Sequence, residues 1–324
     1  MTSWLRRISV VLAAIVPCAA SVARADAPGD AWAAAKGMLP ASPSVVMGLN
    51  LGTIKGSSIF QKLYPTLLEQ AGDAKNVLEE VRTGCGIDVK DAVQSVVLYS
   101  DDNNNGAAFV SLRGVDKGKI GDCMGKLGAK HKKTFKASAA DDKGIVEYSV
   151  SDAPKKLYLA FLPKGVVVVT SDPSDKALLT TALAGRGVDG GSDTGKALAN
   201  TNTGAALWAV VHKPTPLEDG VTMKVGYGTA DIVDANIRGE VRLVLGSDKE
   251  ATSAVTKANA DLENAKKNNE IPPQLAGFVK TVKIVCSVPK PPKSECGSAE
   301  MQVKASMLES EALQLIGMMS AGPQ

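Results

Sequence analysis

The residues that most enzymes use for acid–base chemistry are scarce in this chain of 324 residues. Histidine, the usual base beside a catalytic nucleophile, occurs only twice, at His131 and His212. His131 stands among lysines, and His212 ends a predicted strand. The GxSxG motif, which forms the nucleophile turn of many hydrolases, does not occur. The sequence therefore gives little support to an enzyme built on a Ser-His or Cys-His pair.

Two pairs of adjacent carboxylates remain as candidates for acid–base work, Glu79-Glu80 and Asp141-Asp142. Paired carboxyl groups catalyse glycoside hydrolysis when they flank the scissile bond at a separation of about 5–10 Å. Adjacent acids on a loop or helix are more commonly just solvated. We therefore predict a non-enzymatic protein and keep a carboxylate-based hydrolase as an alternative.

Residues 101–106 (DDNNNG) fit the first half of a calcium-binding loop. Oxygen donors stand at positions 101, 103 and 105, and a glycine follows for the sharp turn. Leu112 occupies the position that should be a bidentate glutamate, and the flanking residues read as strands. Because Asn-Gly between two alternating runs is a strong hairpin signal, we predict a hairpin turn without a metal.

Residues 190–197 (GGSDTGKA) carry the GxxxxGK skeleton of a nucleotide phosphate loop. Ala197 replaces the hydroxyl residue that binds magnesium, and a helix and linker precede the motif instead of a buried strand. We interpret the match as a coincidence within a glycine-rich linker and predict no cofactor.

The densest basic cluster comprises Lys130, Lys132, Lys133 and Lys136. It could attract a phosphate-bearing polymer or an anionic lipid surface. Phe135 is the one aromatic residue that interleaves with it, which gives base stacking little support. A solvated loop or strand edge is favoured, since lysines there discourage edge-to-edge pairing, and nucleic acid is not an expected partner.

Aromatic and methionine residues bear on two kinds of ligand. Aromatic residues make up 4% of the chain, and Trp32 and Trp208 are the only tryptophans after the N-terminal segment, so the exposed platforms of a sugar-binding protein are not expected. A predicted helix over residues 307–319 ends with Met318-Met319 and could line a groove for an apolar ligand or a partner protein. Ordinary core packing explains the same stripe.

The first 25 residues read as a signal peptide. Two arginines precede an apolar run over residues 8–20, and Ala23-Arg24-Ala25 gives the small-x-small pattern of a cleavage site. The run is too short for a transmembrane helix, and no later segment approaches the necessary length without charges. We predict a periplasmic or extracellular protein, without a transmembrane segment after cleavage. Lipidation at Cys18 is an alternative, although Pro17 stands where a small residue is usual.

Without the leader the charges balance, at 34 basic against 34 acidic residues, because Arg6, Arg7 and Arg24 are removed. Four cysteines remain, Cys85, Cys123, Cys286 and Cys296, and an exported protein can oxidise them. Three pairings are open, and the nearest-neighbour pairing is favoured. A metal site has less support, because the sequence lacks CxxC and HxxxH spacings.

An arrangement of strand, tight turn, strand and amphipathic helix recurs four times. The strand pairs are expected over residues 92–113, 157–171, 231–245 and 281–306. The following helices are expected to start at Asp116, Asp172, Ser247 and Ser306, the last two with capping boxes. The offset between the first and third units is 133 residues, and that between the second and fourth is 134, which indicates a duplication.

We therefore predict an α+β protein made of two related halves. Each half is expected to form a mainly antiparallel sheet with helices on one face. The boundaries are a signal peptide at 1–25, a first half at 26–186, a glycine-rich linker at 187–196 and a second half at 197–324.

Residues 43–51 (PSVVMGLNL) and 86–93 (GIDVKDAV) resemble segments of uncharacterised exported bacterial proteins with duplicated α+β halves. The resemblance implies the fold and the compartment and brings no activity or site residues with it. The leading hypothesis is a non-enzymatic protein of the bacterial envelope with a binding role for another protein, or a structural role. A carrier of an apolar ligand held between sheet and helices is the alternative that the helical faces suggest.

Overall fold

The computed structural model shows a mixed α+β protein and describes residues 30–70, 73–103, 105–151, 156–217, 221–291 and 295–320. The described residues form two compact units. The first unit takes residues 30–52 and 62–189, and the second takes residues 53–61 and 190–320. The expected signal peptide at 1–25 lies outside the described residues.

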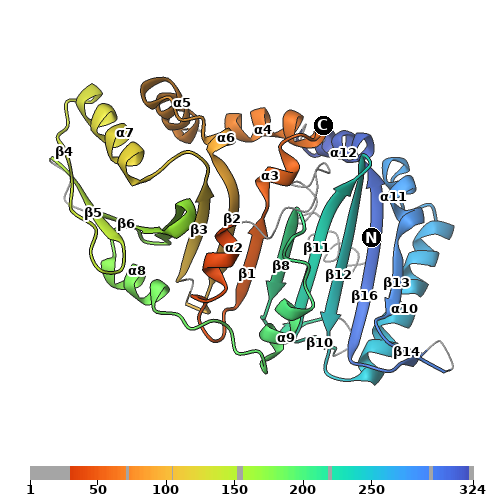
Figure 1. The fold of residues 1–324 in the computed structure, drawn as a ribbon. Coiled ribbons are helices and arrows are strands. Elements are labelled where there is room, and N and C mark those ends of the chain that lie inside the picture. The colour runs from red at the N-terminus through yellow and green to blue at the C-terminus, as the bar shows by residue number, and fades with distance from the viewer. Residues whose placement is uncertain are drawn as a thin grey trace. The chain divides into compact units, whose positions relative to one another are not determined.

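The first unit is built on a sheet in which every neighbouring pair of strands is antiparallel (Figure 1). In spatial order its strands are β1 (Val45–Leu49), β2 (Val93–Ser100), β3 (Gly106–Leu112), β7 (Val166–Thr170), β6 (Leu157–Leu162), β5 (Ile145–Val150) and β4 (Phe135–Ala137). The hairpin predicted around residues 101–106 is present as the β2–β3 connection, with Ser100 opposite Gly106.

Several helices accompany this sheet. They are α2 (Asp30–Ala35), α5 (Asp73–Cys85), α6 (Val89–Ala92), α7 (Lys117–Lys130) and α8 (Lys176–Leu183), while α3 (Leu51–Ile54) and α4 (Ser58–Gln70) cross the unit boundary in sequence. Helix α2 contacts β2 and β3, and α8 contacts β6 and β7, whereas α5 packs on α7 rather than on the strands. The core under these helices includes the cross-strand row of Val97, Phe109 and Val168, whose side chains are at most 2% exposed.

The second unit contains a sheet with the order β8 (Leu207–Val211), β11 (Val225–Val233), β12 (Asn236–Val244), β16 (Glu300–Leu308) and β13 (Lys283–Cys286), again antiparallel throughout. Two small hairpins accompany it, β9 (Thr215–Pro216) with β10 (Thr222–Met223) and β14 (Pro289–Lys290) with β15 (Glu295–Cys296). The helices are α9 (Asp193–Ala199), α10 (Asp248–Lys267), α11 (Ala276–Thr281) and α12 (Glu309–Ser320), with a 3₁₀ turn at Pro273–Leu275.

The two sheets share one strand order, because β8-β11-β12-β16-β13 repeats β1-β2-β3-β7-β6 in sequence and in pairing. The equivalence extends to single residues. The row Val97–Phe109–Val168 corresponds to the row Tyr227–Arg242–Gln302. The sequence offset is 133 at the second position of this row and 134 at the third, as the spacing of the repeats predicted. The shared topology supports a duplication.

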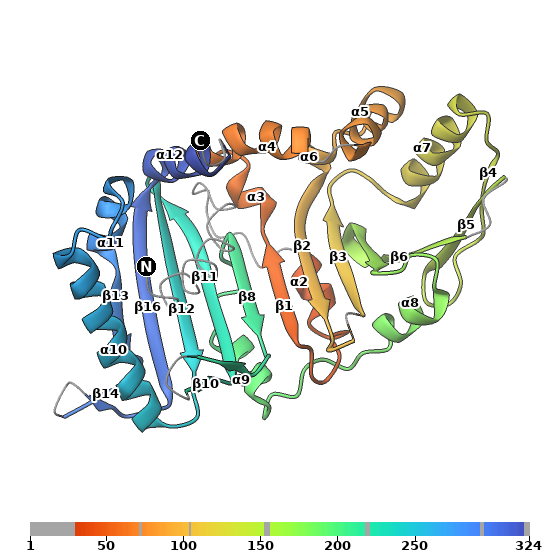
Figure 2. The same ribbon diagram turned by 180° about the vertical axis from the view of Figure 1, so that it is seen from behind.

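Helix α10 forms where the sequence predicts a capping box. The Ser247 side chain accepts a hydrogen bond from the Glu250 amide at 3.2 Å, and the Glu250 carboxylate accepts one from the Gly246 amide at 3.1 Å. Its buried stripe of Ala251, Ala254, Ala258, Leu262 and Ala265 packs on β13 and β16, beside which the helix lies in both views (Figures 1 and 2).

Helix α9 packs on the other face of the same sheet. It buries Ala197 against Val210 and Tyr227, whereas α10 covers Val303, whose strand neighbours are Val241 and then Gly228. Tyr227 and Gly228 are consecutive and so point to opposite faces. Helix α10 therefore covers one face of the second sheet and α9 part of the other, whereas all helices of this half were expected on one face.

Three expected boundaries in the second half of the chain are wrong. The β11–β12 turn lies at Asp234-Ala235, both with positive φ, and Gly239 lies inside a strand. The helix expected over 307–319 begins at Glu309, because the two residues before it continue β16 opposite residues 236 and 237. The linker expected to extend to residue 196 ends earlier, because Ser192 caps a helix that begins at Asp193.

One expected helix start in the first half is also wrong. The helix after β7 begins at Lys176 rather than beside Asp172. Its N-cap is Asp175, whose carboxylate accepts hydrogen bonds from the amides of Ala177 and Leu178 at 2.8 and 3.1 Å. Asp172 instead caps the short turn before it and accepts a bond from the Ser174 amide at 3.0 Å.

Candidate functional site

The four cysteines form two disulfides. Cys85 at the end of α5 is bonded to Cys123 in α7, and Cys286 in β13 is bonded to Cys296 in β15. This is the nearest-neighbour pairing among the three that the sequence left open. Both bonds fix local structure, the first a pair of helices and the second the end of an edge strand.

The first carboxylate pair lies in surface ion pairs. Glu80 accepts a hydrogen bond from Lys130 Nζ at 2.8 Å, and its other oxygen lies 2.9 Å from His131 Nε2. These bonds lower the pKa of Glu80, and a bond from Arg82 lowers the pKa of Glu79. A general acid needs a raised pKa, so this pair has the wrong electrostatics for the hydrolase alternative.

The second carboxylate pair and the DDNNNG segment serve turns. Asp141 accepts bonds from the Ile145 amide at 2.9 Å and the Lys143 amide at 3.0 Å. The Ile145 bond, followed by that from Lys176, lowers the pKa of Asp141. Asp101 likewise accepts bonds from the amides of residues 103 and 105, both at 2.9 Å. These aspartates close β-turns in the way that their side chains often do.

A polar cluster that the sequence analysis did not identify lies on β11, β12 and β16. Arg242 Nε lies 2.7 Å from Glu240, and its NH1 group lies 3.3 Å from Glu300. Tyr227 donates a hydrogen bond to Glu300 at 2.7 Å, and Gln302 donates one to Glu240 at 2.5 Å. The expected turn at 238–239 gave a register in which Tyr227 could not face Arg242, so the cluster was missed.

The charges in this cluster balance when Lys304 is included, because its Nζ lies 3.5 Å from Glu240 and joins Arg242 in opposing the two carboxylates. Burial, followed by the hydrogen bond to Glu300, raises the pKa of Tyr227 to about 12. Burial acts to raise the pKa of Glu240, but bonds from Arg242 and Gln302 outweigh it and leave that pKa below its usual value. A glycosidase-like acid would need the opposite shift, so we interpret the cluster as a cross-strand structural network.

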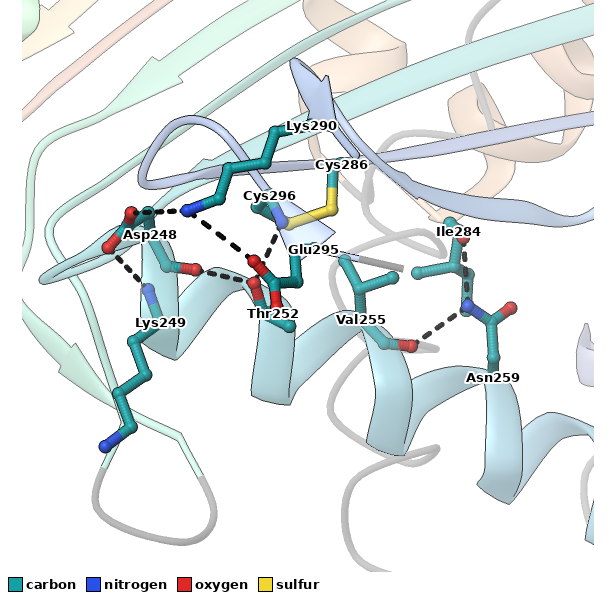
Figure 3. The surroundings of a disulfide bond; sticks show 10 residues. All are labelled: Asp248, Lys249, Thr252, Val255, Asn259, Ile284, Cys286, Lys290, Glu295 and Cys296. Carbon is teal, nitrogen blue, oxygen red and sulfur yellow. Dashed lines mark hydrogen bonds and ion pairs between the residues drawn. A yellow bond between two sulfur atoms is a disulfide. The ribbon is translucent and has the colours of Figure 1, made fainter. Parts of the chain in front are cut away.

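A hollow of about 350 Å³ lies beside the Cys286–Cys296 disulfide at the start of α10 (Figure 3). Asp248 and Glu295 line it, and both face Lys290 Nζ, at 4.0 and 3.6 Å. Thr252 accepts a hydrogen bond from the Cys296 amide at 2.9 Å. Lys249 also lines the hollow, so two acids and two lysines balance there, and the lining suits neither an apolar ligand nor a single strong charge.

The first sheet has one apolar face that its helices leave partly uncovered. Antiparallel neighbours point to the same face, so Met47, Leu98, Ala108 and Val169 form a continuous row across four strands. Met47 is 36% exposed and Leu98 is 41% exposed. We define the open face as these four residues and their partly exposed neighbours Leu49, Val96, Val110, Leu159 and Phe161.

The same positions in the second unit are covered. Val303 corresponds to Val169, and Ile284 corresponds to Leu159; both residues of the second unit are at most 7% exposed beneath α10. The equivalent helix of the first unit, α7, instead contacts β4 at the edge of its sheet. The open face is therefore a sheet surface whose covering helix lies elsewhere, which makes it the candidate functional site.

The other sequence-based candidates do not converge on this face. The glycine-rich segment at 190–197 leads into α9 in the other unit. His212 follows β8, also in that unit. The side chains of residues 315–320, which include Met318 and Met319, are outside the described set. Within the described ranges, histidine, cysteine and acidic side chains do not gather in threes as a metal site requires.

The fold and this face define an α+β protein with two topologically equivalent antiparallel sheets. In the described part of the chain, every helix is too short or too polar to cross a bilayer. No protein-family model matches the sequence, and no curated protein sequence matches it.

Solved structures give distant matches. Crystal form III of TP0453 aligns with a TM-score of 0.47 and 8% identity over 87% of this chain and 96% of that chain. Crystal form I of TP0453 aligns with a TM-score of 0.44 and 8% identity over 88% of this chain and 97% of that chain.

Proposed function

We propose that this protein is an exported, non-enzymatic binding protein of the bacterial envelope, and that it holds a partner protein on the open face. The observation that carries the proposal is the row Met47–Leu98–Ala108–Val169, which is apolar along its length and more than one third exposed at two positions. Exposed apolar patches on folded proteins commonly mark interaction sites.

Export is supported by the leader-like segment and by two disulfides, which are typical of oxidising compartments. Mass spectrometry of the protein purified from a periplasmic fraction tests export. Cleavage after Ala25 gives a chain that begins at Asp26, whereas an intact N-terminus recovered from cytosol would contradict export.

A carrier role has less support from the packing. In the first unit, the space between sheet and helices is filled, since Phe109 and Val168 are fully buried there. In the second unit, Ala251 and Met301 meet between α10 and the sheet with no exposure. An apolar ligand held between these layers would have to displace core side chains.

Site-specific photo-crosslinking in cells tests the proposed function. A benzophenone amino acid at position 98 is expected to give a discrete protein adduct. The matched control is position 77, because Val77 is 56% exposed on α5 and lies outside the open face. Adducts of equal pattern at both positions, or a lipid adduct at position 98, would contradict a protein-binding open face.

A further inference from the structure

The duplicated unit shows how a face of this kind is covered. In the second sheet, α10 lays a narrow stripe of four alanines and one leucine over β13 and β16. Alanine lets a helix approach a sheet closely, because its side chain adds little volume above the backbone. The equivalent strands of the first sheet are β6 and β7, where Leu159, Phe161 and Val169 remain partly exposed.

Helix α7 lies at the rim of this uncovered area. A Cβ placed on Gly128 of α7 would lie 3.4 Å from that of Phe135, and the centroid of the Phe135 ring lies 5.6 Å from that of the Tyr148 ring, to which it is tilted. Alternation through β5, β6 and β7 places Tyr148, Leu159 and Val169 on one face. The open face and α7 are therefore on the same side of the first sheet.

This rim is strongly basic. Residues 113–136 carry eight lysine or arginine residues and two aspartates, a net charge of +6, while the whole chain carries +3. All of the lysines in this segment are exposed. We define the basic rim by Lys117, Lys119, Lys126, Lys130, Lys132, Lys133 and Lys136.

The electrostatics of the helix favour the lysines at its C-terminal end, such as Lys130, but not those at its start. Lys117 and Lys119 lie in the first turn of α7, where the helix dipole disfavours cations. Lys132 has a φ of +55° and occupies the position after the helix where glycine is usual; the Lys133 amide donates to the Gly128 carbonyl at 2.8 Å in the same turn. Three of the rim lysines, Lys117, Lys119 and Lys132, therefore occupy positions that the local structure disfavours.

We propose that the occupant of the open face is an acidic amphipathic helix of the partner protein, seated across β2, β3, β7 and β6 on the face that is equivalent to the one α10 covers in the second sheet. This inference rests on the proposed function and names the partner's binding element. The apolar stripe of the helix would cover Leu98, Leu159 and Val169. Its acidic flank would face the basic rim, because adjacent helices on a sheet lie about 8–10 Å apart.

The test uses the full mature protein and a synthetic helix. The probe is a fluorescent 20-residue peptide with the sequence of residues 248–267, whose four lysines are changed to glutamate and whose helix is fixed by a hydrocarbon staple on the polar side. Fluorescence anisotropy is expected to show saturable binding. Leu98→Lys is expected to weaken it at least tenfold, and the control Val77→Lys to leave it within twofold.

A charge exchange separates complementarity from general attraction. The triple variant Lys126→Glu, Lys132→Glu, Lys136→Glu should bind the acidic peptide at least tenfold more weakly and should gain affinity for the peptide with its original lysines. A control triple of exposed lysines, Lys249→Glu, Lys267→Glu and Lys280→Glu, should do neither. Thermal melts of each variant confirm folding.

The outcomes separate the two proposals. The proposal of an acidic helix is refuted if the peptide does not bind, or if Leu98→Lys and the charge exchange leave its binding unchanged. Binding of phosphatidylglycerol vesicles through the basic rim, with no peptide binding, overturns it in favour of a membrane. If the adduct at position 98 maps to a strand or loop of its partner, the open face remains a protein-binding site and only the helix is refuted.

Discussion

Two alanine substitutions on neighbouring strands should differ sharply in stability, because their side chains point to opposite faces of the first sheet. Phe109 in β3 is fully buried, and its replacement by alanine removes a ring from a packed core. Such truncations cost about 3–5 kcal/mol of the free energy of unfolding. Leu98 in β2 is 41% exposed, so Leu98→Ala forfeits only part of the roughly 1.5–3 kcal/mol of a fully buried leucine, or about 1 kcal/mol.

Urea unfolding of the oxidised protein measures this difference. Hydrogen exchange of peptides from the first unit should accompany it, because two units need not unfold in one transition. Leu98→Ala should leave the protection of β2 and β3 nearly unchanged, whereas Phe109→Ala should lower it throughout the first sheet. A loss of about 3 kcal/mol in Leu98→Ala would mean that Leu98 is packed, and the open face would then not be available to a partner.

Three further predictions concern single features. Replacing both Cys85 and Cys123 by alanine should cost about 4 kcal/mol, since the disulfide spans 38 residues, and native thiol titration should find no free cysteine in the oxidised mature wild type. Glu240 has a pKa below its usual value in the folded state, so its stabilising contribution is present above the unfolded pKa and is lost as the pH falls through the folded pKa. In Glu240→Gln, the free energy of unfolding measured with urea should therefore vary less with pH across that acidic range. Lys132→Gly should raise the melting temperature, because glycine relieves about 1 kcal/mol of backbone strain at positive φ, and an unchanged or lower value would contradict the strain.

The parts of the fold that the sequence predicted are those with a local chemical signature. The hairpin connection before β3, in which Asp101 accepts bonds from the amides of residues 103 and 105 while Gly106 already lies in the strand, and the Ser247–Glu250 capping box each specify their geometry within a few residues. The turn at Asp234-Ala235 has no such signature, since neither residue is glycine although both have positive φ. The turn was predicted at Gly239 instead, and the resulting error in register separated Tyr227 from Arg242, so the polar cluster could not be predicted.

The open face could not be predicted for a different reason. Strand β7 reads as a continuous apolar run, VVVVT, and β2 (VQSVVLYS) contains the run Val96–Tyr99; such runs are typical of strands covered on both sides. Only the packing shows that one side lacks its helix, because α7 contacts β4 instead. Periodicity identifies apolar faces, but the length of a helix and the path of its connection decide which face is covered.

The equivalence of the rows Val97–Phe109–Val168 and Tyr227–Arg242–Gln302 has a consequence for how such a protein can evolve. The first unit uses these positions as apolar core, and the second uses them as a largely buried network of hydrogen bonds and ion pairs, so the two units are not interchangeable at this row. A protein made of two first units would expose two open faces and would be prone to aggregation. In a protein made of two second units, a helix would cover this face of both sheets, and no open face would remain to bind a partner.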